Sequence, residues 1–117
     1  MSIEARVRAA LLPIVPVVEP NQYDGTDTVY ITFRYDEIGV LFAEGEAQAV
    51  RYLLSVSLHM PIRPTAAGES TNPNTLKRRI KAALVGIGCT TPDIVDASDE
   101  GGRIFVFECE ATDNGAA

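Results

Sequence analysis

Two stretches of apolar–polar alternation, with Leu53 as an exception in the second, constrain the fold of this chain more than any other feature. Residues 28–35 and 49–59 each carry β-branched, aliphatic or aromatic side chains at every second position. Successive side chains of a strand point to opposite faces, so this period of two places one face of each segment against a core. Both segments are predicted to be strands with these residues inward: Val29, Ile31, Phe33, Tyr35, Val50, Tyr52, Leu54, Val56 and Leu58.

Two other segments have the spacing and the end signals of helices. Ser2 and Asn72 are residue types that cap helices, and Pro73 stands at the first helical position, where proline is favoured. Pro13 ends the first pattern, and Gly88 can adopt the left-handed conformation that closes the second. The predicted apolar stripes consist of Ile3, Val7, Ala10 and Leu11 in the first helix, and of Leu76, Ile80, Ala83, Leu84 and Ile87 in the second.

The segments between these elements give weaker signals. Residues 14–18 are apolar but contain Pro16, which favours an edge strand or an extended lead-in. Residues 36–46 surround the apolar Val40–Phe42 and are predicted to form a short strand or an arm. Residues 60–72 are rich in Pro, Gly, Ser and Thr, so we expect a mobile loop that only a neighbouring molecule would order.

The C-terminal part predicts a closing hairpin. Residues 94–95 and 103–110 would pair over the loop 98–102, with Phe105, Phe107 and Cys109 on one face. These elements predict a single α+β domain over residues 1–111, with a mixed or antiparallel sheet of about four to five strands and two helices packed on one face. Residues 112–117 are small and polar and are expected to form a flexible tail.

The charges of the chain are unevenly distributed. The net charge of −6 argues against binding of nucleic acid through its phosphates. Residues 70–92 carry four bases and no acid, whereas residues 93–117 carry seven acids and a single base, Arg103. One interpretation is a solvated helix face beside a solvated hairpin. The other is that the basic helix of one subunit contacts the acidic hairpin of the next, a head-to-tail contact that can close into a ring.

The second interpretation names a candidate subunit interface. Its residues are the exposed bases of the predicted helix and the acids of the predicted hairpin. They are Lys77, Arg78, Lys81, Asp96, Asp99, Glu100, Glu108 and Glu110.

Residues that carry out chemistry are few and lack the spacing of a known site. His59 is the only histidine, and no serine or cysteine stands in a nucleophile motif, so His59 is interpreted as a surface residue. Cys89 and Cys109 are too few for a zinc site or a disulfide scaffold. Both are interpreted as small buried apolar residues, with a disulfide bridge as the alternative. No catalytic residue, metal or cofactor is predicted.

The acidic residues do not form a recognisable ion site either. Asp93, Asp96 and Asp99 lie three residues apart instead of two, and the twelfth position from Asp93 is Ile104 where a calcium loop needs a glutamate. Turn formation and solubility explain the cluster better. Membrane insertion is not expected, because no apolar run reaches about 18 residues, and residues 1–4 do not resemble the start of a secretory signal.

The order of elements resembles that of the tail terminator, tail-completion and tail-to-head joining proteins of phages and prophages with long flexible tails, whose fold is the lambda-type terminator fold. The resemblance covers residues 3–111 and is a pattern of elements without a diagnostic motif. It rests on the opening helix followed by residues 13–17, the strand 30–33, the arm 38–46 leading into 51–56, the helix 76–84 with Gly86–Ile87–Gly88, and the end 103–110.

This resemblance implies a virion structural subunit without catalytic residues. Such a protein forms a ring, typically a hexamer, at the head-proximal end of the tail tube, where it stops tube polymerisation and contacts the head connector. It would reside in the host cytoplasm before assembly and in the neck of the virion afterwards. Residues 38–46 and 60–72 would contact other subunits or the tube. The alternatives are another head-completion protein, a bacterial adaptor that binds peptides, and a small enzyme with a shared site around His59.

Overall fold

Five strands and two helices are present in the residues that the computed structural model describes, which are 2–21, 25, 29–43, 46–61, 72–100 and 102–113. The strands form one sheet in the order β1-β2-β3-β5-β4. β1 is parallel to β2, and the other neighbours are antiparallel, so the sheet is mixed. In chain order the elements are α1 (Ile3–Leu11), β1 (Val18–Pro20), β2 (Tyr30–Ala43), β3 (Glu46–Met60), α2 (Pro73–Gly86), β4 (Asp93–Asp96) and β5 (Arg103–Asp113).

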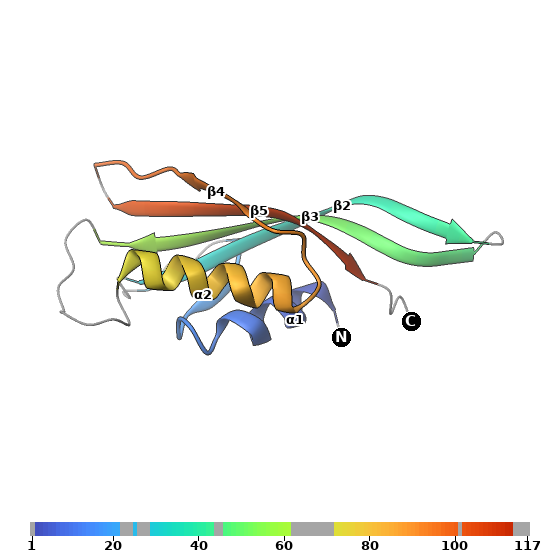
Figure 1. Cartoon of the computed structure of the whole chain (residues 1–117), viewed down its shortest axis with the longest axis horizontal. Coiled ribbons are helices and arrows are strands. Elements are labelled where there is room, and N and C mark those ends of the chain that lie inside the picture. The colour runs from blue at the N-terminus through green and yellow to red at the C-terminus, as the bar shows by residue number, and fades with distance from the viewer. Residues whose placement is uncertain are drawn as a thin grey trace.

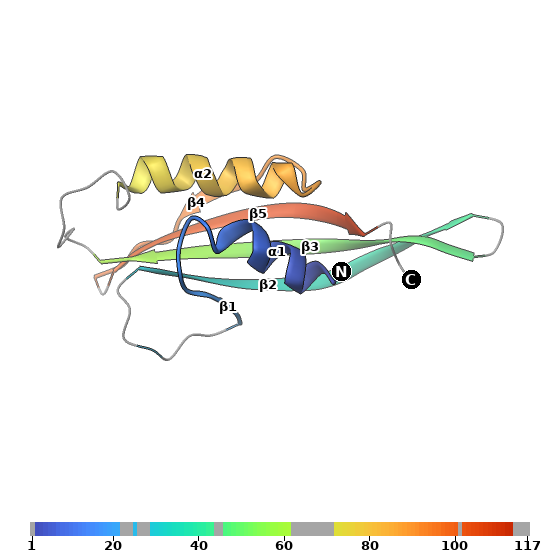
Figure 2. The same cartoon turned by 90° about the horizontal axis from the view of Figure 1, so that it is seen from below.

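Both helices cover the same face of the sheet, which leaves the other face open (Figure 1, Figure 2). The predicted α+β class, with its mixed sheet and two helices on one face, is confirmed. The core is a single layer between sheet and helices, because one stripe of each helix packs on one face of each central strand. Its fully buried residues include Val7 and Leu11 of α1, Ile31 of β2, Leu54, Val56 and Leu58 of β3, Leu76, Ile80 and Leu84 of α2, and Phe107 of β5.

The predicted inward residues of β2 and β3 are not all buried. Ile31 and Phe33 are buried as predicted, but Tyr35 is 37% exposed. Val50 and Tyr52, also predicted to face inward, are only partly buried. These three residues lie beyond the end of β1, which pairs with β2 only as far as Phe33, so an inward direction does not bring full burial there.

Residues 36–46, predicted to be a short strand or an arm, do not form a separate strand, because β2 continues to Ala43 and Glu46 begins β3. β2 pairs with β3 from Tyr30 to Ala43, with irregularities of register between Glu37 and Gly39 and between Leu41 and Phe42. The two strands extend beyond the ends of both helices as a ribbon (Figure 1). The molecule is elongated in consequence, with extents of 55 × 24 × 23 Å.

The predicted capping residues lie at the ends of the helices. The Ser2 hydroxyl accepts a hydrogen bond from the Ala5 amide at 3.1 Å, and the Asn72 side chain accepts one from the Asn74 amide at 2.9 Å. Gly88, just after α2, has a φ of +97°, a conformation in which any other residue would be strained.

Three predicted boundaries need correction or fall outside the described residues. The first weak strand is β1, which lies at Val18–Pro20 and not at 14–18, because only those residues pair with β2. The tail was predicted to begin at Thr112, but Thr112 and Asp113 belong to β5, where they pair with Arg51 and Val50. Residues 62–71 of the predicted loop and residues 114–117 of the predicted tail lie outside the described residues.

The alternation of β5 makes a testable prediction about stability. Phe107 is completely buried, whereas its neighbour Val106 points to the open face and is partly buried. We expect Phe107→Ala to lower the free energy of unfolding by about 3–5 kcal/mol, and the matched Val106→Ala by about 1 kcal/mol or less. Urea denaturation followed by circular dichroism measures both, and equal losses would contradict this register.

Candidate interaction surface

The basic helix and the acidic hairpin lie close together within one subunit. The Lys77 ammonium of α2 lies 4.5 Å from the centre of the Phe105 ring in β5, and the Arg103 guanidinium lies 5.4 Å from it. The pKa of Asp96 is lowered, first by hydrogen bonds from Ser98 and then by the charges of Arg103 and Lys77. Two members of the predicted interface, Lys77 and Asp96, therefore already interact with their own subunit.

Other predicted interface residues face solvent. Arg78 and Lys81 are exposed on α2, away from its buried stripe, and Glu100 and Glu108 are exposed on the hairpin. These four side chains are the members of the predicted set that best suit a contact with another molecule. Their neighbour Arg79 lies elsewhere, because its guanidinium donates to the Pro13 carbonyl at 3.3 Å and links α2 to the segment after α1.

The aspartates of the hairpin shape its turn. The Asp96 carboxylate accepts a hydrogen bond from the Ser98 amide at 2.9 Å, and the Asp99 carboxylate accepts one from the Gly102 amide at 3.1 Å. The Ser98 hydroxyl accepts one from the Ile104 amide at 3.0 Å. Within the described part of the chain no three His, Cys, Asp or Glu side chains come together as metal ligands. Turn formation is therefore the observed role of these acids.

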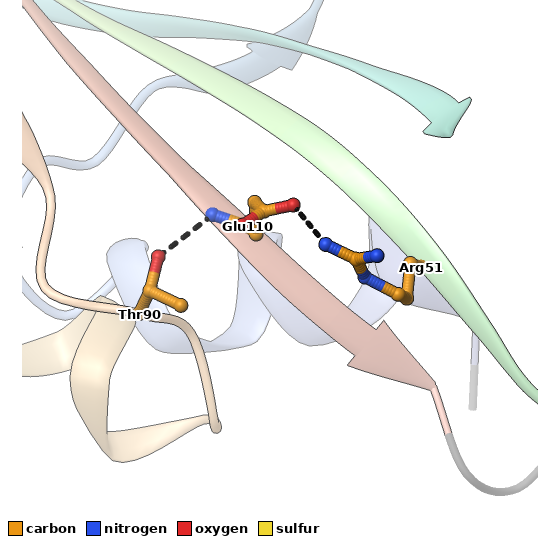
Figure 3. A network of polar contacts seen from close by, with 3 residues as sticks. All are labelled: Arg51, Thr90 and Glu110. Atoms are coloured by element: carbon orange, nitrogen blue, oxygen red, sulfur yellow. Dashed lines mark hydrogen bonds and ion pairs between the residues drawn. The ribbon is translucent and has the colours of Figure 1, made fainter. Parts of the chain in front are cut away.

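Glu110, the last member of the predicted interface, belongs to an intramolecular network (Figure 3). Its carboxylate accepts a hydrogen bond from the Arg51 guanidinium of β3 at 2.5 Å. Its amide donates to the Thr90 hydroxyl, in the segment after α2, at 2.9 Å. Glu110 therefore joins β3, β5 and this segment. Sequence reasoning missed the pair because Arg51 and Glu110 become neighbours only through the register of β3 on β5.

His59 is part of an aromatic and polar cluster on the open face of the sheet, and so is not the plain surface residue that was predicted. Its ring stacks on Tyr30 with 4.4 Å between centroids and 9° between planes. Its Nε2 lies 3.1 Å from the Thr32 hydroxyl, within hydrogen-bonding distance. Burial lowers the pKa of His59, because the charged imidazolium loses hydration there.

Among the described residues, the sheet has unpaired backbone edges and exposed apolar side chains. β4 is an edge strand of four residues, all exposed, and it includes Ile94 and Val95 at 40% and 51% exposure. At the opposite edge β1 pairs with β2 only at Ile31, Thr32 and Phe33. Among the described residues the rest of β2 pairs only with β3. Unpaired edges and exposed apolar residues are features of surfaces that add a strand or dock a partner.

None of the helices in the described residues is long and apolar enough to cross a membrane.

The environment of His59 predicts a pH dependence of stability. Since its pKa is lower in the folded than in the unfolded chain, the unfolded chain binds the proton more readily, and acid favours unfolding. We expect the free energy of unfolding to fall as the pH drops below 6.5 and through the folded pKa. His59→Phe retains an aromatic ring for stacking but cannot titrate, so chemical denaturation should show this slope reduced. An unchanged slope would contradict the prediction.

The ion pair of Arg51 and Glu110 predicts only a small stabilisation. Its side chains are 43% and 41% exposed, so water and salt screen the charges. A double-mutant cycle with Arg51→Met and Glu110→Gln should give a coupling energy below about 1 kcal/mol that decreases at high salt. A salt-independent coupling of several kcal/mol would show that the pair is not screened.

Comparison with known proteins shows the fold alone. No family model and no curated protein matches the sequence. A solved protein structure whose name states no function is similar to 97% of this chain and to 95% of its own, with a TM-score of 0.52 and 14% sequence identity.

Proposed function

We propose that this chain is a phage or prophage structural protein, a tail terminator or head–tail joining subunit. Copies of the chain form a ring, hexameric as in the family it resembles, at the head-proximal end of the tail tube. The ring stops tube polymerisation and joins the tube to the head connector. The subunit carries no catalytic residue and takes no cofactor, and it moves from the host cytoplasm to the neck of the virion on assembly.

The projecting ribbon of β2 and β3 is the observation that carries this proposal. β5 pairs with β3 only as far as Val50, so among the described residues the ribbon beyond that point consists of two strands. A two-stranded ribbon is marginally stable by itself, and three or more strands or a packed face are needed for stability. A neighbouring subunit or the tail tube would supply a further strand or a surface for the ribbon to pack against.

The difference between the two edges of the sheet favours a ring in particular. β4 and the free edge of β2 lie at opposite edges of the sheet and differ in sequence and length. Contacts between two different surfaces of identical subunits are head-to-tail contacts, and these close into rings when the rotation permits. The exposed bases Arg78 and Lys81 and the exposed acids Glu100 and Glu108 supply the opposite charges that would orient neighbours.

A second candidate is a bacterial adaptor that binds an extended peptide. The open edge of β4 favours it, because a peptide can add a strand there and place side chains beside Ile94 and Val95. An adaptor would bind peptides as a monomer, whereas a terminator subunit associates with itself and with tube ends.

Charge reversal tests the ring. Light scattering over a concentration series should show rings for the unchanged protein, and negative-stain images should show them at one end of purified tail tubes. The double variant Arg78→Glu/Lys81→Glu should weaken association at least tenfold, and adding Glu100→Lys/Glu108→Lys should restore it.

The control variant is Arg8→Glu, a charge reversal on α1 outside both charged patches; it also breaks the exposed ion pair of Arg8 with Glu19, so circular dichroism is used to check that it folds. It should associate like the unchanged protein. A protein that remains monomeric at all concentrations and never binds tube ends would exclude the terminator function. Rings that form equally well with all variants would exclude the charged contact.

A further inference from the structure

Cys89 and Cys109 are adjacent in the folded chain although 19 residues separate them in sequence. Cys89 follows the turn that ends α2, and Cys109 lies in β5. Both thiols are free, and the residues are only 7% and 5% exposed in the same core. The residues that follow the two cysteines, Thr90 and Glu110, are joined by two hydrogen bonds. The two cysteines therefore lie side by side in an apolar environment.

The backbone around the two thiols is held in place on both sides. The Thr90 amide donates to the Glu110 carbonyl at 2.9 Å, and the Glu110 amide donates to the Thr90 hydroxyl at 2.9 Å (Figure 3). The Cys89 amide donates to the Leu84 carbonyl of α2 at 3.1 Å. Because these bonds connect the residues next to each cysteine, the relative position of the two cysteines is set by packed elements, not by a loose loop.

The surroundings distinguish the two thiols chemically. The pKa of Cys89 is lowered by the hydrogen bond from Cys109 and by the positive charge of Arg6, although burial opposes this. The pKa of Cys109 is raised by the same hydrogen bond, by burial and by the charge on Cys89. Arg6 is held beside the pair, since its guanidinium donates to the carbonyls of Ile87 and Thr112. The positive charge of Arg6 favours the thiolate of Cys89, so Cys89 is assigned as the attacking thiol.

We propose that Cys89 and Cys109 form a reversible intramolecular disulfide by exchange with a small-molecule disulfide such as oxidised glutathione. The Cys89 thiolate attacks one sulfur of that disulfide, forms a mixed disulfide and expels the first small thiolate. The Cys109 sulfur, losing its proton, then attacks the Cys89 sulfur and expels the second. Overall, two protein thiols are oxidised, one small disulfide is reduced to two thiols, and the two cysteine protons pass to these products.

A metal ion explains this pair less well. Zinc in proteins takes three or four protein ligands, and no third His, Cys, Asp or Glu joins the two thiols within the described part of the chain. A disulfide needs only the two cysteines themselves, whose neighbours Thr90 and Glu110 are hydrogen-bonded to each other.

The disulfide would strengthen one edge of the sheet. The closed loop contains β4, which pairs with β5 through only four residues. A covalent link at its base restricts the unfolded chain and so favours the folded state. This inference does not rest on the proposed function, since it concerns one subunit and is tested without tail tubes.

The test uses the unchanged full-length protein in glutathione buffers of increasing oxidised fraction. Intact mass should decrease by two hydrogen atoms with no glutathione retained, and thiol alkylation after denaturation should label neither cysteine. The melting temperature should rise by roughly 10 °C and return after dithiothreitol. Denaturing gel electrophoresis without reductant should show no covalent dimer.

Cys89→Ala and Cys109→Ala are the matched controls, because each retains one thiol and neither can close the loop. Oxidation should not raise the melting temperature of either variant. Cys89, which remains in Cys109→Ala, should react with oxidised glutathione faster than Cys109, which remains in Cys89→Ala. Two free thiols, a retained glutathione or an intermolecular disulfide in the oxidised unchanged protein would overturn the proposal. That measurement needs no variant and holds even where a variant fails to fold.

Discussion

Burial of one face of the sheet under two helices is the interaction on which the rest of the structure depends. The inward residues of β2, β3 and β5 pack against the stripes of α1 and α2 and have almost no exposed area. Removing such side chains from water is the main favourable term in folding. The register of the strands follows from it, because a shift of one residue would turn every inward side chain toward solvent.

The limited length of the helices explains both the shape and the candidate surface. α1 and α2 cover only part of the long strands, so β2 and β3 continue as a two-stranded ribbon without a helix behind it (Figure 1). Tyr35 lies before this ribbon, opposite the buried Leu54, and is 37% exposed although its position in the alternation is inward. The missing cover makes the ribbon the part of the molecule best suited to a contact with another chain.

The charge asymmetry of the sequence has two roles in the folded chain. α2 packs beside the hairpin of β4 and β5, so Lys77 and Arg103 face Asp96 within one subunit. Arg78, Lys81, Glu100 and Glu108 remain exposed. A charged segment in a sequence therefore identifies candidate contacts, but packing decides which of its members are available to a partner. Which residues of the candidate interface remain exposed could not be predicted from the sequence, because the rotation of α2 and the position of the hairpin depend on long-range contacts.

Local patterns in the sequence determined the elements of this protein: the alternation of β2, β3 and β5, the caps at Ser2 and Asn72, and the left-handed Gly88. These features depend on residues a few positions apart, so they can be seen without the fold. The tertiary structure alone decided which distant residues meet. The placement of Cys89 beside Cys109, the pair of Arg51 with Glu110 and the stacking of His59 on Tyr30 all join different elements. Their physical cause is strand register and helix packing, which no local pattern encodes.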